Sequence, residues 1–431
     1  MGSERQAVRQ LAGRASLVLI GSGGAAVLSL VGQVLIARRL GAGVYGDYTY
    51  TLSWIAMLGL FTAVGIPAAS MRFVAQYRAT NETERLSVYR GWSLSVVTLC
   101  SAAVSLLVVV AVSLWPRPLA DGLRSAILAG ALLLTVNTVL QVVGSHLQGL
   151  GRAATSNAIL GVVRGASFVL VVWLAVPGTI ASAGGVLVAN AVTAGIALLV
   201  VVLVSQRLFG SAPRFRGFRL AGEDGWLRTS QHLLLVGAAQ VVLASTDTIL
   251  LGLIRGTSES GPYVASSQLA GAIGVGVAAL SSIVAPGIAS HWAQGDRDGT
   301  RALVRRGRNL LLVFAVITAI VLAFAAPMLL GIFGKEFRGS VAVLRILLIG
   351  QVILSANFAA GFLLTMTGHE RTASRLIAGM ALLNLILNAL LIPRFGAVGA
   401  ATATMLAVST RATLLARASK EVLAGRGEVL R

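Results

Sequence analysis

Charged residues are scarce in this sequence. They make up 12 % of the 431 residues, whereas hydrophobic residues make up 56 %. A soluble domain carries about 25 % charged residues, so this chain could not cover its own surface with polar groups in water. We therefore expect an integral membrane protein.

Cysteine and catalytic motifs are also lacking. The single cysteine, Cys100, excludes a disulfide within the chain, and the four histidines show no metal-ligand spacing. There is no Walker A lysine, no GxSxG or HExxH motif and no pair of carboxylates in one apolar-bounded segment. We expect no enzymatic activity, no metal centre and no cofactor. Energy for any transport would come from an ion gradient, the membrane potential or consumption of the product.

The charge that is present is mostly positive, with 35 Lys and Arg against 15 Asp and Glu and a net charge of +20. In a soluble protein this would indicate a nucleic-acid partner. A membrane protein instead concentrates basic residues in its cytoplasmic loops. Placing both termini in the cytoplasm gives an inside-to-outside ratio of basic loop residues of about three to one. This ratio predicts a multi-pass protein of the cytoplasmic membrane and no nucleic-acid partner.

Apolar runs long enough to cross a bilayer, about 20 residues each, predict an all-α protein of about twelve transmembrane helices. Six runs precede a polar stretch and six follow it. They cover about 16–37, 48–71, 91–114, 124–146, 154–175, 180–204, 230–254, 264–288, 309–331, 341–364, 373–392 and 396–415. We expect a six-helix lobe at 1–206, a cytoplasmic linker at 207–229, a second six-helix lobe at 230–416 and a cytoplasmic tail at 417–431. The linker alternates Arg with Phe, which fits either an interfacial or a solvated segment.

An internal repeat relates the two halves. Its anchors are separated by 218 or 219 residues: Gly43-Val44-Tyr45 matches Gly261-Pro262-Tyr263, Pro67 matches Pro286, and Gly149 with Arg152 matches Gly368 with Arg371. Because six helices separate equivalent points, the repeat is parallel, with its axis along the membrane normal. Such a repeat predicts two lobes around a central cleft that can hold a substrate.

Three stretches carry a family resemblance. VLIARRLGAGVYGDYTYTLSWIAMLGLFTAVGIPAASMRFVAQY (34–77), STDTILLGLIRGTSESGPYVASSQLAG (245–271) and LIPRFGAVGAATATMLA (391–407) resemble the polysaccharide and oligosaccharide flippases of the Wzx type. The resemblance implies a member of the multidrug/oligosaccharidyl-lipid/polysaccharide exporter superfamily. It implies a polyprenyl-pyrophosphate-linked oligosaccharide as substrate, moved to the outer leaflet for cell-surface polysaccharide assembly, with membrane lipids and envelope assembly proteins as partners.

Four alternatives stay open. A multidrug antiporter of the same fold would need a carboxylate in an N-terminal span, and none follows Asp47 there. A lipid II flippase usually has fourteen helices. A membrane glycosyltransferase or polymerase usually carries a large outer loop, and the outer loops here are short. A scaffold that does not transport is also compatible with the sequence.

Charges within spans are the candidate functional residues, because burying one in hydrocarbon costs about 2.5–3.5 kcal/mol on insertion scales. Arg164 lies near the middle of the fifth run, between Gly161 and Gly165. Its guanidinium could bind a diphosphate through bidentate hydrogen bonds. The alternative is a structural arginine that is paired with helix carbonyls or polar side chains.

Asp247 is the corresponding acidic candidate, in the seventh run. It could bind H⁺ or Na⁺ and couple transport to an ion gradient, or it could form a structural salt bridge with an arginine. Polar uncharged residues in the spans usually form interhelical hydrogen bonds, and they could also bind sugar hydroxyls. Asn384 and Asn388, one turn apart, share a helix face and are candidates for substrate contact.

Several arginines lie at predicted helix ends, where a long side chain reaches the interface easily. The resemblance places the first, second, seventh and eighth helices at the cleft, so Arg38, Arg72 and Arg255 are further candidates for substrate contact. Arg345, one turn into the tenth run, is expected to be an interfacial anchor.

Overall fold

The computed structural model describes residues 2–115, 120–175, 181–215, 225–366 and 369–423. Gly368 of the predicted repeat, part of the predicted linker (216–224) and the end of the predicted tail (424–431) lie outside the described residues. Within the described residues all regular structure is helical, which confirms the expected all-α class.

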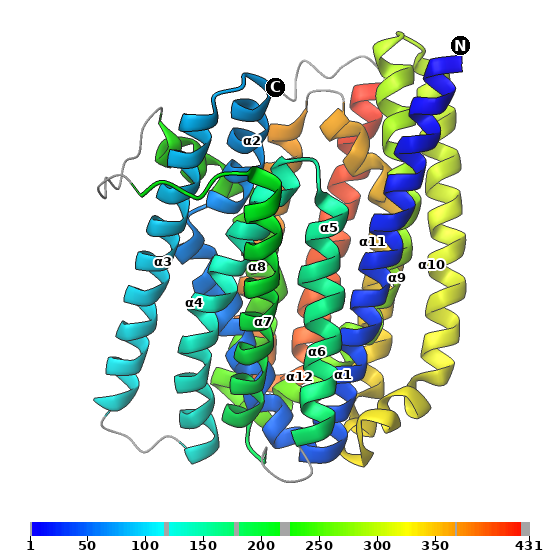
Figure 1. The fold of residues 1–431 in the computed structure, drawn as a ribbon. Coiled ribbons are helices and arrows are strands. Elements are labelled where there is room, and N and C mark those ends of the chain that lie inside the picture. Colours follow the sequence, from blue (N-terminus) through cyan, green and yellow to red (C-terminus); the bar gives the residue numbers. More distant parts are fainter. Residues whose placement is uncertain (1, 116–119, 176–180, 216–224, 367–368, 424–431) are drawn as a thin grey trace. The chain divides into compact units, whose positions relative to one another are not determined.

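The chain divides into two compact units, Met1–Val241 and Val242–Arg431. Figure 1 labels their helices in chain order. Unit 1 contains α1 (Gly2–Ala63), α2 (Ile66–Ala79), α3 (Thr83–Ser113), α4 (Asp121–Gly149), α5 (Ala153–Asn157), the π-helix η1 (Ala158–Val163), α6 (Arg164–Ala175), α7 (Ala183–Phe209) and the first part of α8 (Trp226–Arg255). Unit 2 contains the rest of α8, α9 (Thr257–Ala293), α10 (Arg297–Phe333), the 3₁₀ helix η2 (Lys335–Ser340), α11 (Val341–Met366) and α12 (Glu370–Leu423). The unit boundary therefore falls inside a continuous helix.

Among the described residues, nine helical stretches are long and apolar enough to cross a membrane. Two of them, in α1 and α12, contain a glycine with non-helical geometry, Gly41 and Gly396 respectively. Each of these helices therefore comprises two arms, which correspond to two of the predicted apolar runs. Loops were expected at these places, and single glycines with φ of 82° and 54° make the bends instead.

A similar glycine bend occurs near the start of unit 2. Gly256 separates α8 from α9 with φ 96° and ψ 156°, and Gly41 bends α1 with φ 82° and ψ 173°. The buried tyrosines of the predicted repeat follow these glycines, Tyr45 in unit 1 and Tyr263 in unit 2. Equivalent points of the two halves thus have similar local backbone geometry.

The second apolar run is not the continuous helix that we expected at 48–71. The chain breaks after Ala63, where Val64 and Gly65 take positive φ values of 49° and 72°. A Cβ on Gly65 would lie 2.0 Å from the Ser230 carbonyl oxygen, so α8 approaches too closely for any side chain there. Arg72, expected at the end of that run, instead lies within the separate helix α2.

Two other predicted boundaries also differ from the helices. The polar stretch between the halves is shorter than 207–229, because α7 continues to Phe209 and α8 begins at Trp226. The last helix runs to Leu423, beyond residue 417, where a tail was expected to begin.

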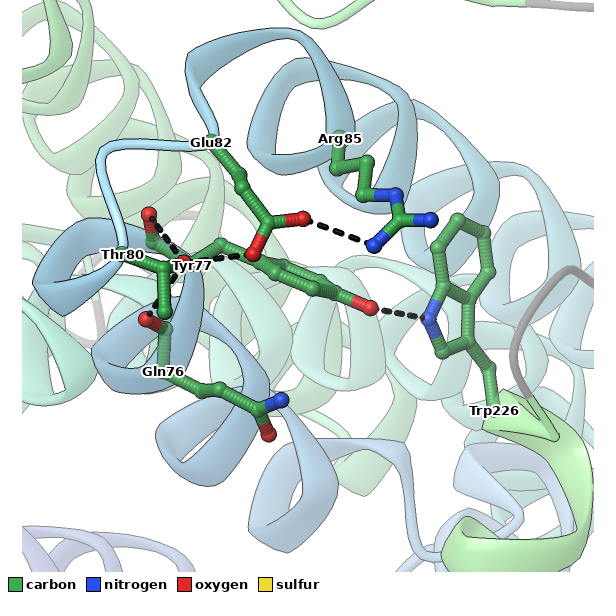
Figure 2. A network of polar contacts seen from close by, with 6 residues as sticks. All are labelled: Gln76, Tyr77, Thr80, Glu82, Arg85 and Trp226. Carbon is green, nitrogen blue, oxygen red and sulfur yellow. Dashed lines mark hydrogen bonds and ion pairs between the residues drawn. The ribbon is translucent and has the colours of Figure 1, made fainter.

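An aromatic cluster fixes the first turns of α8 within unit 1. Trp226 is 1 % exposed and packs on Tyr89 and Trp92, with ring centroids 5.1 and 5.2 Å away. Its indole Nε1–H donates to the Tyr77 hydroxyl over 2.8 Å (Figure 2). The chain before α8 is attached to the same region, because the Arg214 amide donates to the Ser87 carbonyl of α3.

The turn between α2 and α3 holds a separate polar network, also drawn in Figure 2. The Glu82 carboxylate accepts from the Thr80 hydroxyl over 2.6 Å and from the Arg85 guanidinium over 2.8 Å. These two hydrogen bonds hold the pKa of Glu82 below its ordinary value, the Thr80 bond having the larger effect. These contacts close the turn between α2 and α3.

The Trp226–Tyr77 hydrogen bond should contribute measurably to the stability of unit 1. A double-mutant cycle of Trp226→Phe and Tyr77→Phe, followed by unfolding in detergent, should give a coupling energy of about 0.5–1.5 kcal/mol, the net contribution of a buried hydrogen bond. A second cycle that pairs Trp226→Phe with Tyr50→Phe, outside the cluster, should give additive effects. Additivity in both cycles would contradict this assignment.

Candidate functional site

Arg164 lies at a local irregularity of its span. The six residues before it, Ala158–Val163, form the π-helix η1, and α6 begins at Arg164 itself. Short π-helical turns within α-helices are frequent at functional sites. The glycines on either side allow close packing on α1: a Cβ on Gly161 would lie 2.6 Å from the Ala25 Cβ, and one on Gly165 would lie 3.1 Å from the Leu28 Cβ.

The Arg164 guanidinium is held by two amide side chains. Its Nη1 donates to Asn137 Oδ1 of α4 over 2.8 Å, and its Nη2 donates to Asn190 Oδ1 of α7 over 2.9 Å. Asn190 in turn donates to the Tyr48 hydroxyl of α1 over 3.2 Å. Among the described residues, no carboxylate forms an ion pair with Arg164. The partners therefore orient the positive charge and do not neutralise it.

Cavities adjoin this arrangement. Arg164 and Asn190 line one of about 360 Å³, together with Ser29, Phe168 and neighbouring small residues. Asn137 lines another, of about 300 Å³, which also contains Gln141 and Thr138. The hydrogen bond from Arg164 to Asn137 thus joins groups that line two cavities of unit 1. The predicted structural pairing with polar side chains is present, and a binding role is compatible with it.

Asp247 is the centre of a second cluster, within unit 2. The side chain is 5 % exposed. Its Oδ2 accepts from the hydroxyls of Tyr263 in α9 and Thr404 in α12, each over 2.5 Å. Its Oδ1 accepts from Asn388 Nδ2 over 2.6 Å. No arginine among the described residues pairs with it, so the structural salt bridge that we considered is not found there.

Asn384 and Asn388 belong to the same cluster. Asn384 Nδ2 donates to the Thr404 hydroxyl over 3.0 Å, so this hydroxyl accepts one hydrogen bond and donates the one to Asp247. The Oδ1 atoms of Asn384 and Asn388 are both buried and accept no hydrogen bond from any residue that the structure describes. A carboxylate beside two unpaired amide oxygens is a set of acceptors that lacks a positive partner. Carboxylate, amide and hydroxyl oxygens are the ligands that hard cations prefer.

The remaining predicted arginines lie apart from these clusters and are exposed. Arg38 and Arg72 are on the surface of unit 1, with the Arg72 guanidinium 5.9 Å from the Phe73 ring centroid. Arg255 pairs with Glu259 over 3.2 Å, and a Cβ on Gly396 would lie 2.5 Å from Glu259 Oε2. This ion pair therefore lies at the bend of α12 and agrees with an anchoring role.

Three partners were not singled out from the sequence: Tyr48, Tyr263 and Thr404. Tyr263 was part of the repeat, but its pairing with Asp247 depends on a helix bend that hydropathy does not reveal. Thr404 lies in a run of small residues, where nothing in the sequence marks it out.

Comparison with known proteins agrees with this fold. The family model described as "Polysaccharide biosynthesis protein" matches residues 12–292. This chain belongs to that family. It is also similar to the probable low-salt glycan biosynthesis flippase Agl15 of Haloferax volcanii, with 26 % identity over 170 residues. That match spans 39 % of this chain and only 36 % of the relative.

Solved structures of transporters share the fold across nearly the whole chain. An inward-facing multidrug resistance MATE family transporter of the MOP superfamily matches with a TM-score of 0.75, 11 % identity and coverage of 94 % of this chain and 96 % of the other. A MOP superfamily transporter from Pyrococcus furiosus gives a TM-score of 0.66, 11 % identity and coverage of 96 % and 95 %. A mutant of the Vibrio cholerae MATE transporter VcmN gives 0.64, 15 % identity and 99 % coverage of both chains. The expected two-lobed, multi-pass membrane fold is confirmed.

The Asp247 cluster makes a specific prediction about Thr404. Thr404→Val removes a partly buried hydroxyl that donates to the buried Asp247 carboxylate, and it should lower the free energy of unfolding by about 1.5–3 kcal/mol. The matched control is Thr402→Val, because the Thr402 hydroxyl donates only to a carbonyl of its own helix. Chemical unfolding in detergent measures both variants. Equal effects of the two substitutions would contradict the cluster as described.

Proposed function

We propose that this protein is a flippase that moves a polyprenyl-pyrophosphate-linked oligosaccharide across the cytoplasmic membrane by alternating access, for cell-surface polysaccharide assembly. Both termini would lie in the cytoplasm. The family and the flippase relative support the class of activity. The observation that carries the proposal is the Arg164 guanidinium, which is held by neutral amides, lacks a carboxylate partner among the described residues and lines a cavity.

The chemistry of a diphosphate suits this arginine. A guanidinium has five N–H groups, and the described hydrogen bonds to Asn137 and Asn190 use one donor on each terminal nitrogen. The remaining donors can bind phosphate oxygens in the bidentate manner that arginine favours. Because the amides carry no charge, a phosphate does not have to displace a competing carboxylate. Arg38, Arg72 and Arg255 remain proposed contacts at the surface, where each would interact more weakly.

Asp247 is the proposed site of ion coupling. Its carboxylate, with the unpaired Oδ1 atoms of Asn384 and Asn388, would accept H⁺ or Na⁺. We therefore assign these two asparagines to the ion and not to the sugar. A chain without a nucleotide-binding motif needs such an energy source if it moves cargo against a gradient.

An ion-coupled multidrug exporter is the second candidate, because the fold is shared with MATE transporters. The charge at Arg164 favours the flippase. A cationic drug would be repelled by an unneutralised guanidinium, whereas a diphosphate would be attracted to it. The two candidates therefore predict cargo of opposite charge.

Substitution of Arg164 tests the substrate site. In proteoliposomes with a fluorescent lipid-linked oligosaccharide, Arg164→Gln should slow translocation about 10- to 100-fold, as expected for loss of a charge-assisted hydrogen bond of about 1.5–3 kcal/mol. Arg164→Lys keeps the charge without the fork and should be intermediate. The control is Arg39→Gln, since Arg39 is exposed and, among the described residues, donates only to the Trp173 carbonyl. Full activity of Arg164→Gln would refute the site, and drug efflux without lipid translocation would refute the flippase.

Substitution of Asp247 tests coupling separately. Asp247→Asn removes the charge while keeping the side-chain size, so translocation should lose its response to an imposed Na⁺ or pH gradient. The exposed carboxylate of Asp121 provides the control variant, Asp121→Asn, which should respond as the wild type does. Gradient-dependent transport by Asp247→Asn would exclude this residue as the coupling site.

A further inference from the structure

A groove between α10 and α11 in unit 2 has no part in the proposed transport mechanism. It encloses about 450 Å³ and is lined almost entirely by apolar side chains, with one exception, Arg345. The α10 wall consists of Val316, Ala319, Ile320 and Ala323, and the α11 wall consists of Leu348, Ile349, Val352 and Ile353. An arginine in such a lining requires an explanation.

The groove exists because two residues of α10 are small. Ala319 and Ala323 are four positions apart, so they lie on one face of the helix and leave room opposite the longer α11 side chains. Large apolar residues beside them on α10, such as Ile317 and Phe324, are 58 % and 83 % exposed. In a membrane-spanning helix an exposed apolar face contacts lipid. The groove thus lies next to a face that hydrocarbon chains cover.

Part of the role of Arg345 is structural. Pro327 lies within α10 and has no amide hydrogen, so the carbonyl of Ala323, four residues earlier, loses its helical donor. Arg345 Nε approaches that carbonyl oxygen at 3.4 Å. This bond occupies one of the five N–H groups of the guanidinium. Neither terminal nitrogen has a partner among the described residues, and no carboxylate there pairs with Arg345.

The position of this free guanidinium fork along the helix indicates its ligand. Arg345 lies about one turn into α11, directly after η2, which contributes the exposed Lys335 and Arg338 at the same end of the helix pair. The distribution of basic residues among the loops places this end of the helix pair outside the cell, where basic residues are few. The positive-inside rule therefore does not explain the three basic residues here. A cation at headgroup depth above an apolar groove is complementary to a lipid with a negative headgroup and a hydrocarbon chain.

We propose that this groove binds one anionic glycerophospholipid of the surrounding membrane, with its phosphate on the Arg345 fork and part of one acyl chain between α10 and α11. The volume is sufficient, since a cavity of about 150 Å³ holds benzene and this groove, at about 450 Å³, is about three times as large. The apolar lining gives no reason to favour a sugar or a second phosphate.

Native mass spectrometry of the purified protein tests the site, with phosphatidylglycerol and phosphatidylcholine as probes at equal concentration. Wild type should retain one phosphatidylglycerol in preference to phosphatidylcholine. Arg345→Gln should weaken this binding about tenfold or more, as expected for loss of a bidentate charged contact. Ala319→Phe fills the groove and keeps the arginine, and it should weaken binding similarly. Arg394→Gln removes another exposed positive charge and should bind as wild type does.

Each other outcome overturns part of the proposal. Wild-type binding by both Arg345→Gln and Ala319→Phe would remove the site, and Ala319→Phe decides the question if Arg345→Gln fails to fold. Equal retention of the two lipids would refute the anionic headgroup. Displacement of phosphatidylglycerol by a lower concentration of polyprenyl phosphate would assign the groove to the cargo. Only the polyprenyl phosphate result would bear on the proposed cargo site at Arg164, and the other outcomes leave the flippase proposal unaffected.

Discussion

A charge in the hydrocarbon region must find its partners inside the protein, and this constraint determines how both units are built. Arg164 in unit 1 donates hydrogen bonds to side chains of two other helices. Asp247 in unit 2 accepts hydrogen bonds from side chains of two other helices. In the hydrocarbon region of a bilayer an unpaired polar group costs several kcal/mol, far more than at a protein surface. The polar side chains that meet these two charges therefore specify which helices come together in each unit.

The two units meet this constraint with related local structures. In unit 2 the hydroxyl of Tyr263, after the bend at Gly256, donates to Asp247. In unit 1 the hydroxyl of Tyr45, after the bend at Gly41, donates to Gln33 Oε1 over 2.7 Å. In each half, the tyrosine at the equivalent position of the repeat thus donates a hydrogen bond to the helical segment that precedes the glycine bend. The acceptor is the neutral Gln33 amide in unit 1 and the ionisable Asp247 carboxylate in unit 2.

The sequence predicted the helical class and the approximate spans well, because these depend on local composition. Burial of a helix in lipid requires about 20 apolar residues in a row, and that requirement is visible without any tertiary contact. The choice of Arg164 and Asp247 followed from the same reasoning, since a charge within such a run is rare and costly.

What the sequence did not predict depends on contacts between distant segments. Gly65 breaks the second run because Ser230, 165 positions later, lies against it, and no local pattern contains that information. The π-helical turn before Arg164 has no marker in its residues. Thr404 and Tyr48 are recognisable as partners only after α12 and α1 have been placed. Asparagines illustrate the limit most clearly: Asn137 and Asn190 orient a cation, whereas Asn384 and Asn388 surround an anion.

The different protein partners of the two charges bear on how transport could be driven. The described partners of Arg164 all belong to unit 1, and those of Asp247 all belong to unit 2. Neither charge depends on an ion pair with the other for its hydrogen bonding. Binding of an anionic cargo at Arg164 and of a cation at Asp247 can therefore be separate events, each with its own affinity.

Thermodynamic coupling between these two binding events would require a conformational equilibrium of the chain. A ligand shifts such an equilibrium only if it binds the two conformations with different affinities. The continuous helix α8 crosses the unit boundary, with Trp226 packed in unit 1 and Asp247 about six turns later in unit 2. It is thus one covalent element that connects the proposed ion site with unit 1.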